Sequence, residues 1–331
     1  MISNVTVERI DKGTVKICWE TGLSDLAVSI HVGQSPDSID RTSPAHTVTG
    51  RTSIEISGLD PHLRHYFEVA PQGGSGFITA ERRVPLERTV NFRDLGGYEN
   101  SEGLRVKWGQ IFRSDNFSRL TPRDQALLKG MGIKLVCDFR TPSEVQKSPD
   151  RLPDESIGYL HLPVIHGEFD FMTALERLKN GDESQPSKDF MVKSYLQNIE
   201  EFPDIWGRVL DRIAKRDDRP LIFHCTGGKD RAGTCSAILL LALGVPEETV
   251  VYDHQLSNVF IAPMLKKVSE RVESYGVDPE KVLPYFTAPR ECIDSLLDHI
   301  RETYGSADNY LRTRAKVSDD TLLLLKQELL E

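Results

Sequence analysis

The residues best suited to chemistry lie in one segment, LIFHCTGGKDRAGT. Its apolar start predicts a buried strand that ends at Cys225, and an apolar helix is predicted to begin just after Arg231. In an open parallel sheet, ligands bind beyond the carboxyl ends of the strands. Gly227 and Gly228 let the intervening backbone curl, so that its amides and the helix N-terminus can face an anion. The residues from Cys225 to Arg231, here called the signature loop, are therefore predicted to bind a phosphoryl group.

Two side chains of the signature loop suit a covalent reaction at phosphorus. The planar guanidinium of Arg231 can bind two phosphoryl oxygens. The positive field that attracts phosphate also favours the thiolate of Cys225 over the thiol, and the thiolate is the nucleophile. We therefore expect a phosphocysteine intermediate that water hydrolyses. An isolated cysteine would more simply be a small buried residue, but the His-Cys pair, both glycines and the arginine coincide here.

Three charged residues near the signature loop each allow two interpretations. Lys229 adds a positive charge suited to multiply phosphorylated headgroups, or it is a solvated lysine on the rim. A bound phosphate repels the carboxylate of Asp230, which favours the protonated form and a role as general acid. The alternative for Asp230 is a structural ion pair with a neighbouring Lys or Arg. Asp138 ends the IKLVCD strand at the same predicted crevice, where it is either the alternative acid or a group that orients Arg231.

The second part of the chain has the pattern of an α/β domain. Strands are predicted at IKLVCDF, YLHLPV and PLIFHC, with helices at TPRDQALLKGMG, from Thr141, and at AGTCSAILLLALGV. Thr121 and Ser318 are predicted helix N-caps. Strands that alternate with helices predict a mostly parallel sheet flanked by helices on both faces.

Residues 1–86 instead alternate apolar and polar residues in short strands, VTVERI, TVKICWE, LAVSIHVG and TSIEISGL. Trp19 is predicted to point inward. Leu59, Pro61 and Tyr66 have the spacing of a tyrosine corner, and this half resembles a fibronectin type III-like β-sandwich. We expect two domains, this small all-β sandwich at 1–86 and a catalytic domain at 87–331.

Composition narrows the class of protein. The 331 residues are 39% hydrophobic and 27% charged, which are ordinary globular values. The net charge of −9 disfavours nucleic acid as a partner. The longest apolar run, AILLLALGV, is shorter than the ~18 residues of a membrane span, and the N-terminal residues lack a secretory signal pattern. Five scattered cysteines without metal-ligand spacing favour a reduced, cytoplasmic protein with no metal, although secretion without a cleaved signal stays open.

The HCxxxxxR spacing is the signature of the cysteine-dependent protein tyrosine phosphatase superfamily. Over most of residues 88–331, NFRDLGGY, IFRSDNFSRLT, LVCDFRTPSEV, HCTGGKDRAG and DHQLSN resemble a bacterial tyrosine and lipid phosphatase family with a GKDR loop. The resemblance implies a cysteine-phosphatase fold, no cofactor, and phosphotyrosine proteins or phosphoinositides as substrates. It implies that Cys225 is the nucleophile and Asp230 the acid. The residues that would bind the phosphate are Thr226, Gly227, Gly228, Lys229, Asp230 and Arg231.

Other motif residues are expected to support the site. His224 is expected to hydrogen-bond locally and hold the loop, Arg140 and Glu144 to form ion pairs, and Arg93 and Asp94 to be structural. A further hypothesis places a lid over the site between residues 169 and 215. Its shielding side chains would be Phe169, Phe171, Phe190, Met191 and Tyr195.

One departure from the family pattern concerns the residue after Arg231. Many relatives have Ser or Thr there, whose hydroxyl donates to the leaving thiolate, whereas this chain has Ala232. Thr234 lies about 200° further around a helix, so it cannot simply substitute. We expect the phosphocysteine to be hydrolysed more slowly than it forms. The rival interpretations are a phosphate-binding pseudophosphatase and an adaptor that binds a protein partner through its N-terminal domain.

Overall fold

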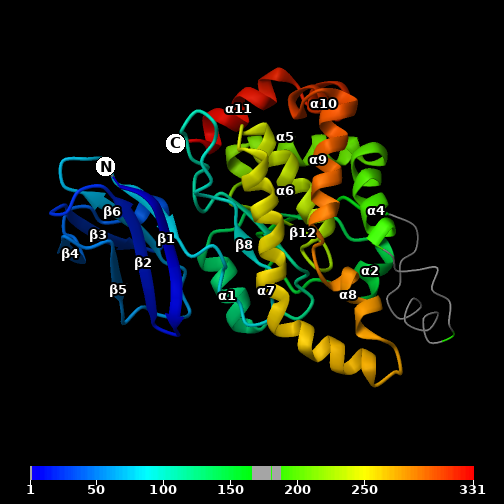
Figure 1. The fold of residues 1–331 in the computed structure, drawn as a ribbon, viewed down its shortest axis with the longest axis horizontal. Helices are drawn as coiled ribbons and strands as arrows, with labels where there is room; N and C mark the ends of the chain where they lie inside the picture. Colours follow the sequence, from blue (N-terminus) through cyan, green and yellow to red (C-terminus); the bar gives the residue numbers. More distant parts are fainter. Residues whose placement is uncertain (1, 166–179, 181–187) are drawn as a thin grey trace.

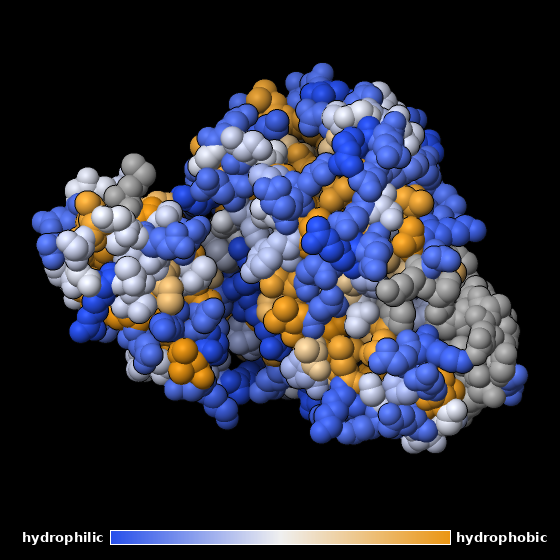
Figure 2. All heavy atoms as spheres, viewed as in Figure 1, coloured by the Kyte–Doolittle hydropathy of each residue, from blue (hydrophilic) through white to orange (hydrophobic). Residues whose placement is uncertain are grey.

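The protein has two lobes that lie side by side in the computed structural model, which describes residues 2–165, 180 and 188–331 (Figure 1). The smaller lobe holds only strands and one short 3-10 helix, and the larger lobe combines helices with a central sheet. A space-filling view shows the same two lobes with a notch between them at the lower edge (Figure 2). The prediction of a mixed α/β chain is therefore confirmed.

The smaller lobe contains two antiparallel sheets. One has the order β1-β2-β5 and consists of β1 (Ile2–Asp11), β2 (Thr14–Thr21) and β5 (Ser53–Ile56). The other has the order β4-β3-β6-β7 and consists of β4 (His46–Thr49), β3 (Ala27–Gly33), β6 (Tyr66–Pro71) and β7 (Phe77–Ala80). Trp19 and Ile17 from one sheet and Ile30 and Phe67 from the other share one buried cluster. The inward position predicted for Trp19 is confirmed.

The central sheet of the larger lobe has the order β11-β10-β12-β9-β8. The first four strands pair in parallel, and they are β11 (Gly158–His161), β10 (Leu135–Asp138), β12 (Leu221–His224) and β9 (Ile111–Ser114). The short β8 (Arg93–Asp94) pairs with β9 in the antiparallel sense. The register aligns Asp138 with His224 and His224 with Ser114. The carboxyl ends of three strands therefore meet at one edge of the sheet.

Both faces of this sheet are buried. Leu221 and Phe223 of β12 belong to one apolar cluster, whereas Ile222 between them belongs to another. Because successive side chains of a strand point to opposite faces, this division means that apolar layers cover the sheet on both sides. The apolar run after the signature loop forms α6 (Asp230–Ala242), most of which is buried.

The other helices surround α6 and the sheet (Figure 1). In the described part of the chain they are α1 (Pro122–Gly130), α2 (Pro142–Lys147), α4 (Lys188–Glu201), α5 (Pro203–Ala214), α7 (Glu247–Glu273), α8 (Leu283–Phe286), α9 (Arg290–Tyr304), α10 (Ala307–Thr313) and α11 (Asp319–Leu329). The predicted N-caps Thr121 and Ser318 are confirmed, since each accepts a hydrogen bond from an amide of the first turn, and Thr141 caps α2 in the same way. Within the described residues, no helix has the length and apolar character to cross a membrane.

A buried ion pair joins the two lobes. The Arg64 guanidinium donates through Nη2 to Asp94 Oδ2 at 2.8 Å and through Nε to the Tyr66 hydroxyl at 2.8 Å. Tyr66 packs with Ile39 of its own lobe and Trp108 of the larger one. A tyrosine corner would place the hydroxyl on the backbone of its own sandwich, so the structure corrects that prediction. Tyr66 is an interface residue because its ring packs against Trp108 of the larger lobe, and Arg64 of its own lobe binds its hydroxyl.

Arg64→Ala is expected to lower the free energy of unfolding by about 3 kcal/mol, because it leaves the Asp94 carboxylate buried without its cation. Unfolding in guanidinium chloride, followed by circular dichroism, measures this change. The matched control is Arg312→Ala, which removes exposed ion pairs and should change stability by less than about 1 kcal/mol. Equal effects of the two substitutions would contradict the importance given to the interface pair.

Candidate active site

The signature loop lies at the carboxyl edge of the central sheet. β12 ends at His224 and α6 begins at Asp230, one residue before Arg231 and so slightly earlier than predicted. Cys225 is 2% exposed, at the base of the loop. The first turn of α6 has no side-chain cap. Its amides, which lack partners within the helix, are thus available to an anion.

The carbonyl groups of the signature loop are held on one side by donors from distant parts of the chain. Asn116 donates through Nδ2 to the Thr226 carbonyl at 3.0 Å. Asn91 Nδ2 donates to the Gly228 carbonyl at 2.9 Å, and Arg113 Nη2 donates to the same carbonyl at 2.9 Å and to that of Lys229 at 3.0 Å. Because N–H and C=O of a trans peptide point in opposite directions, this arrangement turns amides of the loop toward the other side. That side is where an anion would bind.

Gly228 makes this close approach possible. Its φ is +63°, a conformation that L side chains rarely adopt, and a Cβ there would lie 2.4 Å from the Ser114 carbonyl carbon. At Gly227, by contrast, the nearest atom to such a Cβ is the Lys229 Cβ at 3.9 Å. Of the two glycines, only Gly228 is therefore required for steric reasons.

A buried group of charges lies behind the loop. Asp253 of α7 binds Arg93 Nε at 3.2 Å and Arg113 Nη1 at 2.6 Å, and these three side chains are no more than 1% exposed. Burial alone would raise the pKa of Asp253, but the two guanidinium groups hold it below its usual range. Burial and the neighbouring Arg113 lower the pKa of Arg93 to about 10, so it stays charged at neutral pH. Two cations against one carboxylate leave net positive charge behind the loop, which favours an anion in front of it.

Glu144 of α2 holds the guanidinium of Arg231. Its carboxylate accepts two hydrogen bonds, from Nη1 at 2.7 Å and Nη2 at 2.8 Å, and a third from the Thr226 hydroxyl. Although partial burial opposes ionisation, these bonds lower the pKa of Glu144 to about 2. Burial likewise disfavours the charge of Arg231, but Glu144 and Cys225 raise its pKa above the ordinary value. The predicted ion-pairing role of Glu144 is confirmed.

Lys229 is buried rather than solvated, with 4% of the residue exposed. Its ammonium group donates to the carbonyls of Tyr285 at 2.5 Å and Thr287 at 2.6 Å, at the end of α8. It also lies 3.5 Å from Asp230 Oδ2. The alternative of a solvated rim lysine is therefore wrong. In this structure Lys229 joins the end of α8 to the signature loop.

Asp230 is the carboxylate that opens α6, and its side chain is 30% exposed. Its Oδ1 accepts a hydrogen bond from the Tyr195 hydroxyl at 3.0 Å. Tyr195 was expected in a lid, but it is fully buried in the main core, as Met191 nearly is. Phe190 packs against Tyr285 with ring centroids 6.3 Å apart. The remaining lid residues, Phe169 and Phe171, lie outside the described residues.

Asp138 ends β10 at the expected edge of the sheet, but its carboxylate binds partners other than Arg231. It is fully buried and accepts hydrogen bonds from Arg140 Nη2 and the Tyr159 hydroxyl, each at 2.7 Å. Burial would raise its pKa, but the bonds to Arg140 and the nearby His224 lower that pKa to about 2. A carboxylate so ionised and occupied is poorly suited to donate a proton. Glu144, and not Asp138, is the carboxylate that binds Arg231.

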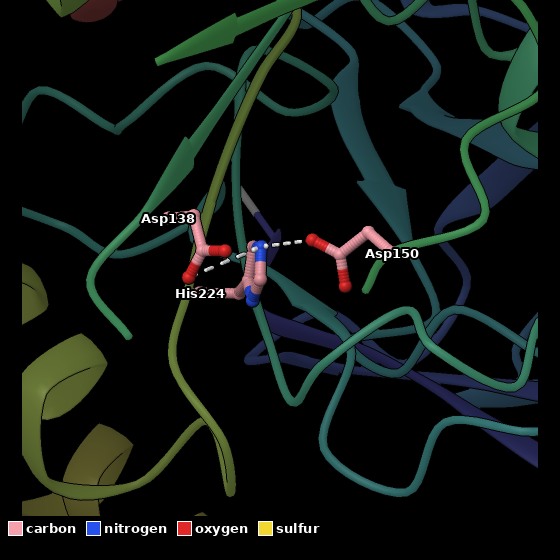
Figure 3. A group of neighbouring side chains, drawn as sticks. All are labelled: Asp138, Asp150 and His224. Carbon is pink, nitrogen blue, oxygen red and sulfur yellow. Dashed lines mark ion pairs between the residues drawn. The ribbon is translucent and has the colours of Figure 1, made fainter. Parts of the chain in front are cut away.

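His224 is fully buried between two carboxylates, those of Asp138 and Asp150 (Figure 3). Its Nδ1 lies 3.2 Å from the Cys225 carbonyl, so the expected local hydrogen bond is present. Asp138, Asp150 and His224 have the spacing of a metal site. However, Arg140 Nη2 already lies 2.7 Å from Asp138 and 2.8 Å from Asp150. The guanidinium supplies the positive charge that a metal ion would bring, so we assign no metal to this group.

Two residues that follow Arg231 in the sequence, Ala232 and Thr234, concern the step in which a phosphocysteine would be hydrolysed. Ala232 is fully buried. The Thr234 hydroxyl donates to the Asp230 carbonyl at 3.1 Å and accepts from Asn198 Nδ2 at 2.8 Å. The Thr234 hydroxyl thus donates its proton to the backbone of α6 and accepts a hydrogen bond from a side chain of α4. It does not take the place of a hydroxyl at position 232.

A comparison with known protein families shows to which family this chain belongs. The sequence profile described as the tyrosine phosphatase family matches residues 84–331, about three quarters of the chain. The chain belongs to the tyrosine phosphatase family. The family match begins close to the predicted start of the catalytic domain and contains every residue of the candidate site described above.

Proteins of other organisms are similar to this chain to different degrees. H16_A0669 of Cupriavidus necator, named as a tyrosine-protein phosphatase, is 29% identical over 75% of this chain and 90% of its own length. The triple specificity protein phosphatase PtpB of Mycobacterium tuberculosis is 29% identical over 72% of this chain and 96% of its own length. The crystal structure of P. aeruginosa TpbA covers 46% of this chain and 71% of TpbA, at 16% identity and a TM-score of 0.25. That last likeness is too small to bear on the fold.

Sequence reasoning missed several residues of this tyrosine phosphatase site. Asn91, Arg113 and Asp253 lie within the motifs NFRDLGGY, IFRSDNFSRLT and DHQLSN, yet no contact between them and the loop was predicted. The available signal was charge inside otherwise apolar segments, because a buried charge requires a partner of opposite sign. The spacing of the motifs does not indicate which charges pair.

Gly228→Ala is expected to lower the free energy of unfolding by about 2 kcal/mol or more, through the strained backbone and the overlap with Ser114. Gly227→Ala is the matched control, since its added methyl group meets open space, and it should lose far less stability. Thermal or denaturant unfolding measures both variants. Similar losses in the two would contradict the close packing assigned to Gly228.

Proposed function

We propose that this tyrosine phosphatase hydrolyses phosphomonoesters of phosphotyrosine proteins through a phosphocysteine intermediate, without a metal ion. One observation carries the proposal: the base of the signature loop holds Cys225 beside the uncapped N-terminus of α6, with net positive charge behind it. Such a field stabilises both a thiolate and a phosphoryl dianion. The residues proposed to bind the phosphate are Thr226, Gly227, Gly228, Lys229, Asp230 and Arg231.

In the first step, the Cys225 thiolate attacks phosphorus and the bond from phosphorus to the ester oxygen breaks. Arg231, held by Glu144, offers its guanidinium to the phosphoryl oxygens. Asp230 in its protonated form gives its proton to the departing phenolic oxygen. We assign this role to Asp230 and not to Asp138, because Asp230 is partly exposed at the loop whereas Asp138 is buried in bonds to Arg140.

In the second step, water attacks the phosphocysteine and the sulfur–phosphorus bond breaks. The Asp230 carboxylate takes a proton from that water, and the products are inorganic phosphate and the regenerated thiolate. Ala232 offers no hydroxyl to the leaving sulfur. The loop amides and the α6 N-terminus are then the main groups that stabilise the departing thiolate.

We extend the proposal to phosphoinositides as a second substrate class. The relative PtpB is named as a triple specificity phosphatase, so a broad substrate range has a precedent among similar proteins. Lys229 would have to exchange its bonds to the carbonyls of Tyr285 and Thr287 for a second phosphate. A pseudophosphatase is the second candidate function, favoured by Ala232 alone.

The organisation of the chain is part of the proposal. We propose two domains, a fibronectin type III-like sandwich at 1–86 and the catalytic domain at 87–331 with a cysteine-phosphatase fold. The buried clusters support two domains, because one cluster is confined to the smaller lobe and two cover the central sheet, although Val84 and Leu86 at the proposed boundary pack with the central sheet. All five cysteines are free, which supports a reduced, cytoplasmic setting.

Cys225→Ser is expected to abolish phosphate release from an aryl phosphate in the presence of EDTA, because the hydroxyl is a far weaker nucleophile than the thiolate. The wild type should remain active in EDTA. The variant should still bind inorganic phosphate, which shows that the loop is intact. Activity that survives in the variant would contradict the assignment of the nucleophile, and a wild type that only binds phosphate would favour the pseudophosphatase.

Rapid mixing with an aryl phosphate is expected to give a burst of phenol followed by a slower steady state, because Ala232 leaves the second step without a hydroxyl donor. Ala232→Ser should raise the steady-state rate about tenfold, which corresponds to about 1.4 kcal/mol and so to one ordinary hydrogen bond, and leave the burst rate nearly unchanged. Stopped-flow absorbance follows both phases. A linear trace from the first turnover would contradict this account.

A further inference from the structure

A chain of buried hydrogen bonds reaches the signature loop from α7, and the proposed reaction does not yet use it. The Tyr195 hydroxyl of α4 lies 3.0 Å from Asp230 Oδ1 and 2.7 Å from His254 Nε2 of α7. Tyr195 is 0% exposed and His254 1% exposed. Their rings pack edge to face with centroids 5.6 Å apart. The Tyr195 hydroxyl restricts the carboxyl group that it contacts, and His254 in turn restricts the hydroxyl.

The positions of the protons in this series of hydrogen bonds follow from Gln255, at the end away from Asp230. Gln255 Oε1 accepts from Asn258 Nδ2 at 3.0 Å, so the amide nitrogen of Gln255 is the group that faces His254. That nitrogen lies 3.1 Å from His254 Nδ1 and also donates to the Ala288 carbonyl at 2.9 Å. Because an amide nitrogen only donates, His254 Nδ1 must accept, and the imidazole proton lies on Nε2.

The direction of the remaining bonds is then fixed. His254 donates through Nε2 to the Tyr195 oxygen, and Tyr195 donates its own proton to Asp230 Oδ1. Burial and the nearby Arg113 lower the pKa of His254 to about 3, so the ring stays neutral and keeps this tautomer at physiological pH. Every donor in the chain therefore points toward Asp230.

We infer that Tyr195 and His254 are positioning residues for Asp230, an inference that rests on the proposed function of Asp230 as general acid. With Oδ1 bound to Tyr195, the carboxyl proton is confined to Oδ2, which lies 3.5 Å from the Lys229 ammonium group and which we take to be the oxygen that faces the ester. Once that proton has moved to the leaving group, the Tyr195 hydroxyl stabilises the carboxylate that forms. Tyr195 thus acts on the reaction through Asp230 and does not touch the substrate.

The test uses the leaving-group dependence of kcat/KM in the full-length protein. This parameter covers the steps up to the phosphocysteine and does not depend on its hydrolysis. Tyr195→Phe should lower kcat/KM for phenyl phosphate about 10- to 100-fold, a part of what general-acid catalysis contributes. For 4-nitrophenyl phosphate the loss should be less than about threefold, because that leaving group departs without a proton.

Tyr310→Phe is the matched control, since it also removes the hydroxyl of a fully buried tyrosine, one that donates to the Ile199 carbonyl. It should leave both values of kcat/KM within about twofold of the wild type, as expected for a substitution away from the reacting groups. A general structural effect would lower kcat/KM equally for the two substrates in both variants. Equal loss on the two substrates in Tyr195→Phe would overturn the inference.

Asp230→Asn separates this inference from the function on which it rests. If Asp230 is the acid, this variant loses much more activity on phenyl phosphate than on 4-nitrophenyl phosphate. An equal loss on both would remove the acid role itself. If Asp230→Asn discriminates and Tyr195→Phe does not, only the inference fails.

His254→Gln tests the same chain without changing Tyr195, and it applies also if Tyr195→Phe does not fold. Its loss should again be confined to phenyl phosphate and be smaller than that of Tyr195→Phe. The double variant should lose no more than Tyr195→Phe alone, because His254 acts through the tyrosine hydroxyl. Additive losses, or equal losses of His254→Gln on the two substrates, would overturn the inference.

Discussion

The larger lobe depends on one buried carboxylate, that of Asp253. Two guanidinium groups, from Arg93 and Arg113, meet on it with almost no exposure to solvent. Neither arginine could be buried at these positions without it, because an unpaired charge in the interior is strongly destabilising. The Tyr98 hydroxyl donates to the same carboxylate at 3.0 Å. This carboxylate thereby joins α7 to β8, to β9 and to the turn that follows β8.

The shape of the signature loop follows from that constraint. Once its position is fixed by Asp253, Arg113 has a second amino group free to hold the carbonyls of Gly228 and Lys229. Holding carbonyls behind the loop is what turns amides to its front. On the front, Glu144 sets the plane of the Arg231 guanidinium through two parallel bonds. The geometry of the signature loop is thus produced by residues outside it, whereas the loop itself contains the groups that are proposed to react.

The same division, between the signature loop and the residues that hold it, explains which parts of the structure could be predicted from the sequence. The strands β10 and β12 and the helix α6 could be predicted because their apolar runs are uninterrupted. The strand β9 of the central sheet was not predicted, since Arg113 interrupts its apolar pattern and the burial of that arginine depends on Asp253. The spacing of the residues in the signature loop predicts a loop that binds a phosphoryl group. The sequence does not predict the partners of its charged residues, because a motif does not state which of several carboxylates lies beside a given arginine. Glu144 rather than Asp138 binds Arg231 for this reason.

The dependence on Asp253 also bears on how the chain is made. A ribosome releases the sequence from its N-terminus, so Arg93 and Arg113 emerge well before the carboxylate that neutralises them, which lies 140 residues after Arg113. Cys225 likewise precedes Asp253 in the sequence. A nascent chain that ends before α7 holds the thiol but has no means of burying the two arginines together. Under the proposed function, Cys225 therefore acquires its anion-binding surroundings only after the first turns of α7 have been synthesised and the lobe can close around the signature loop.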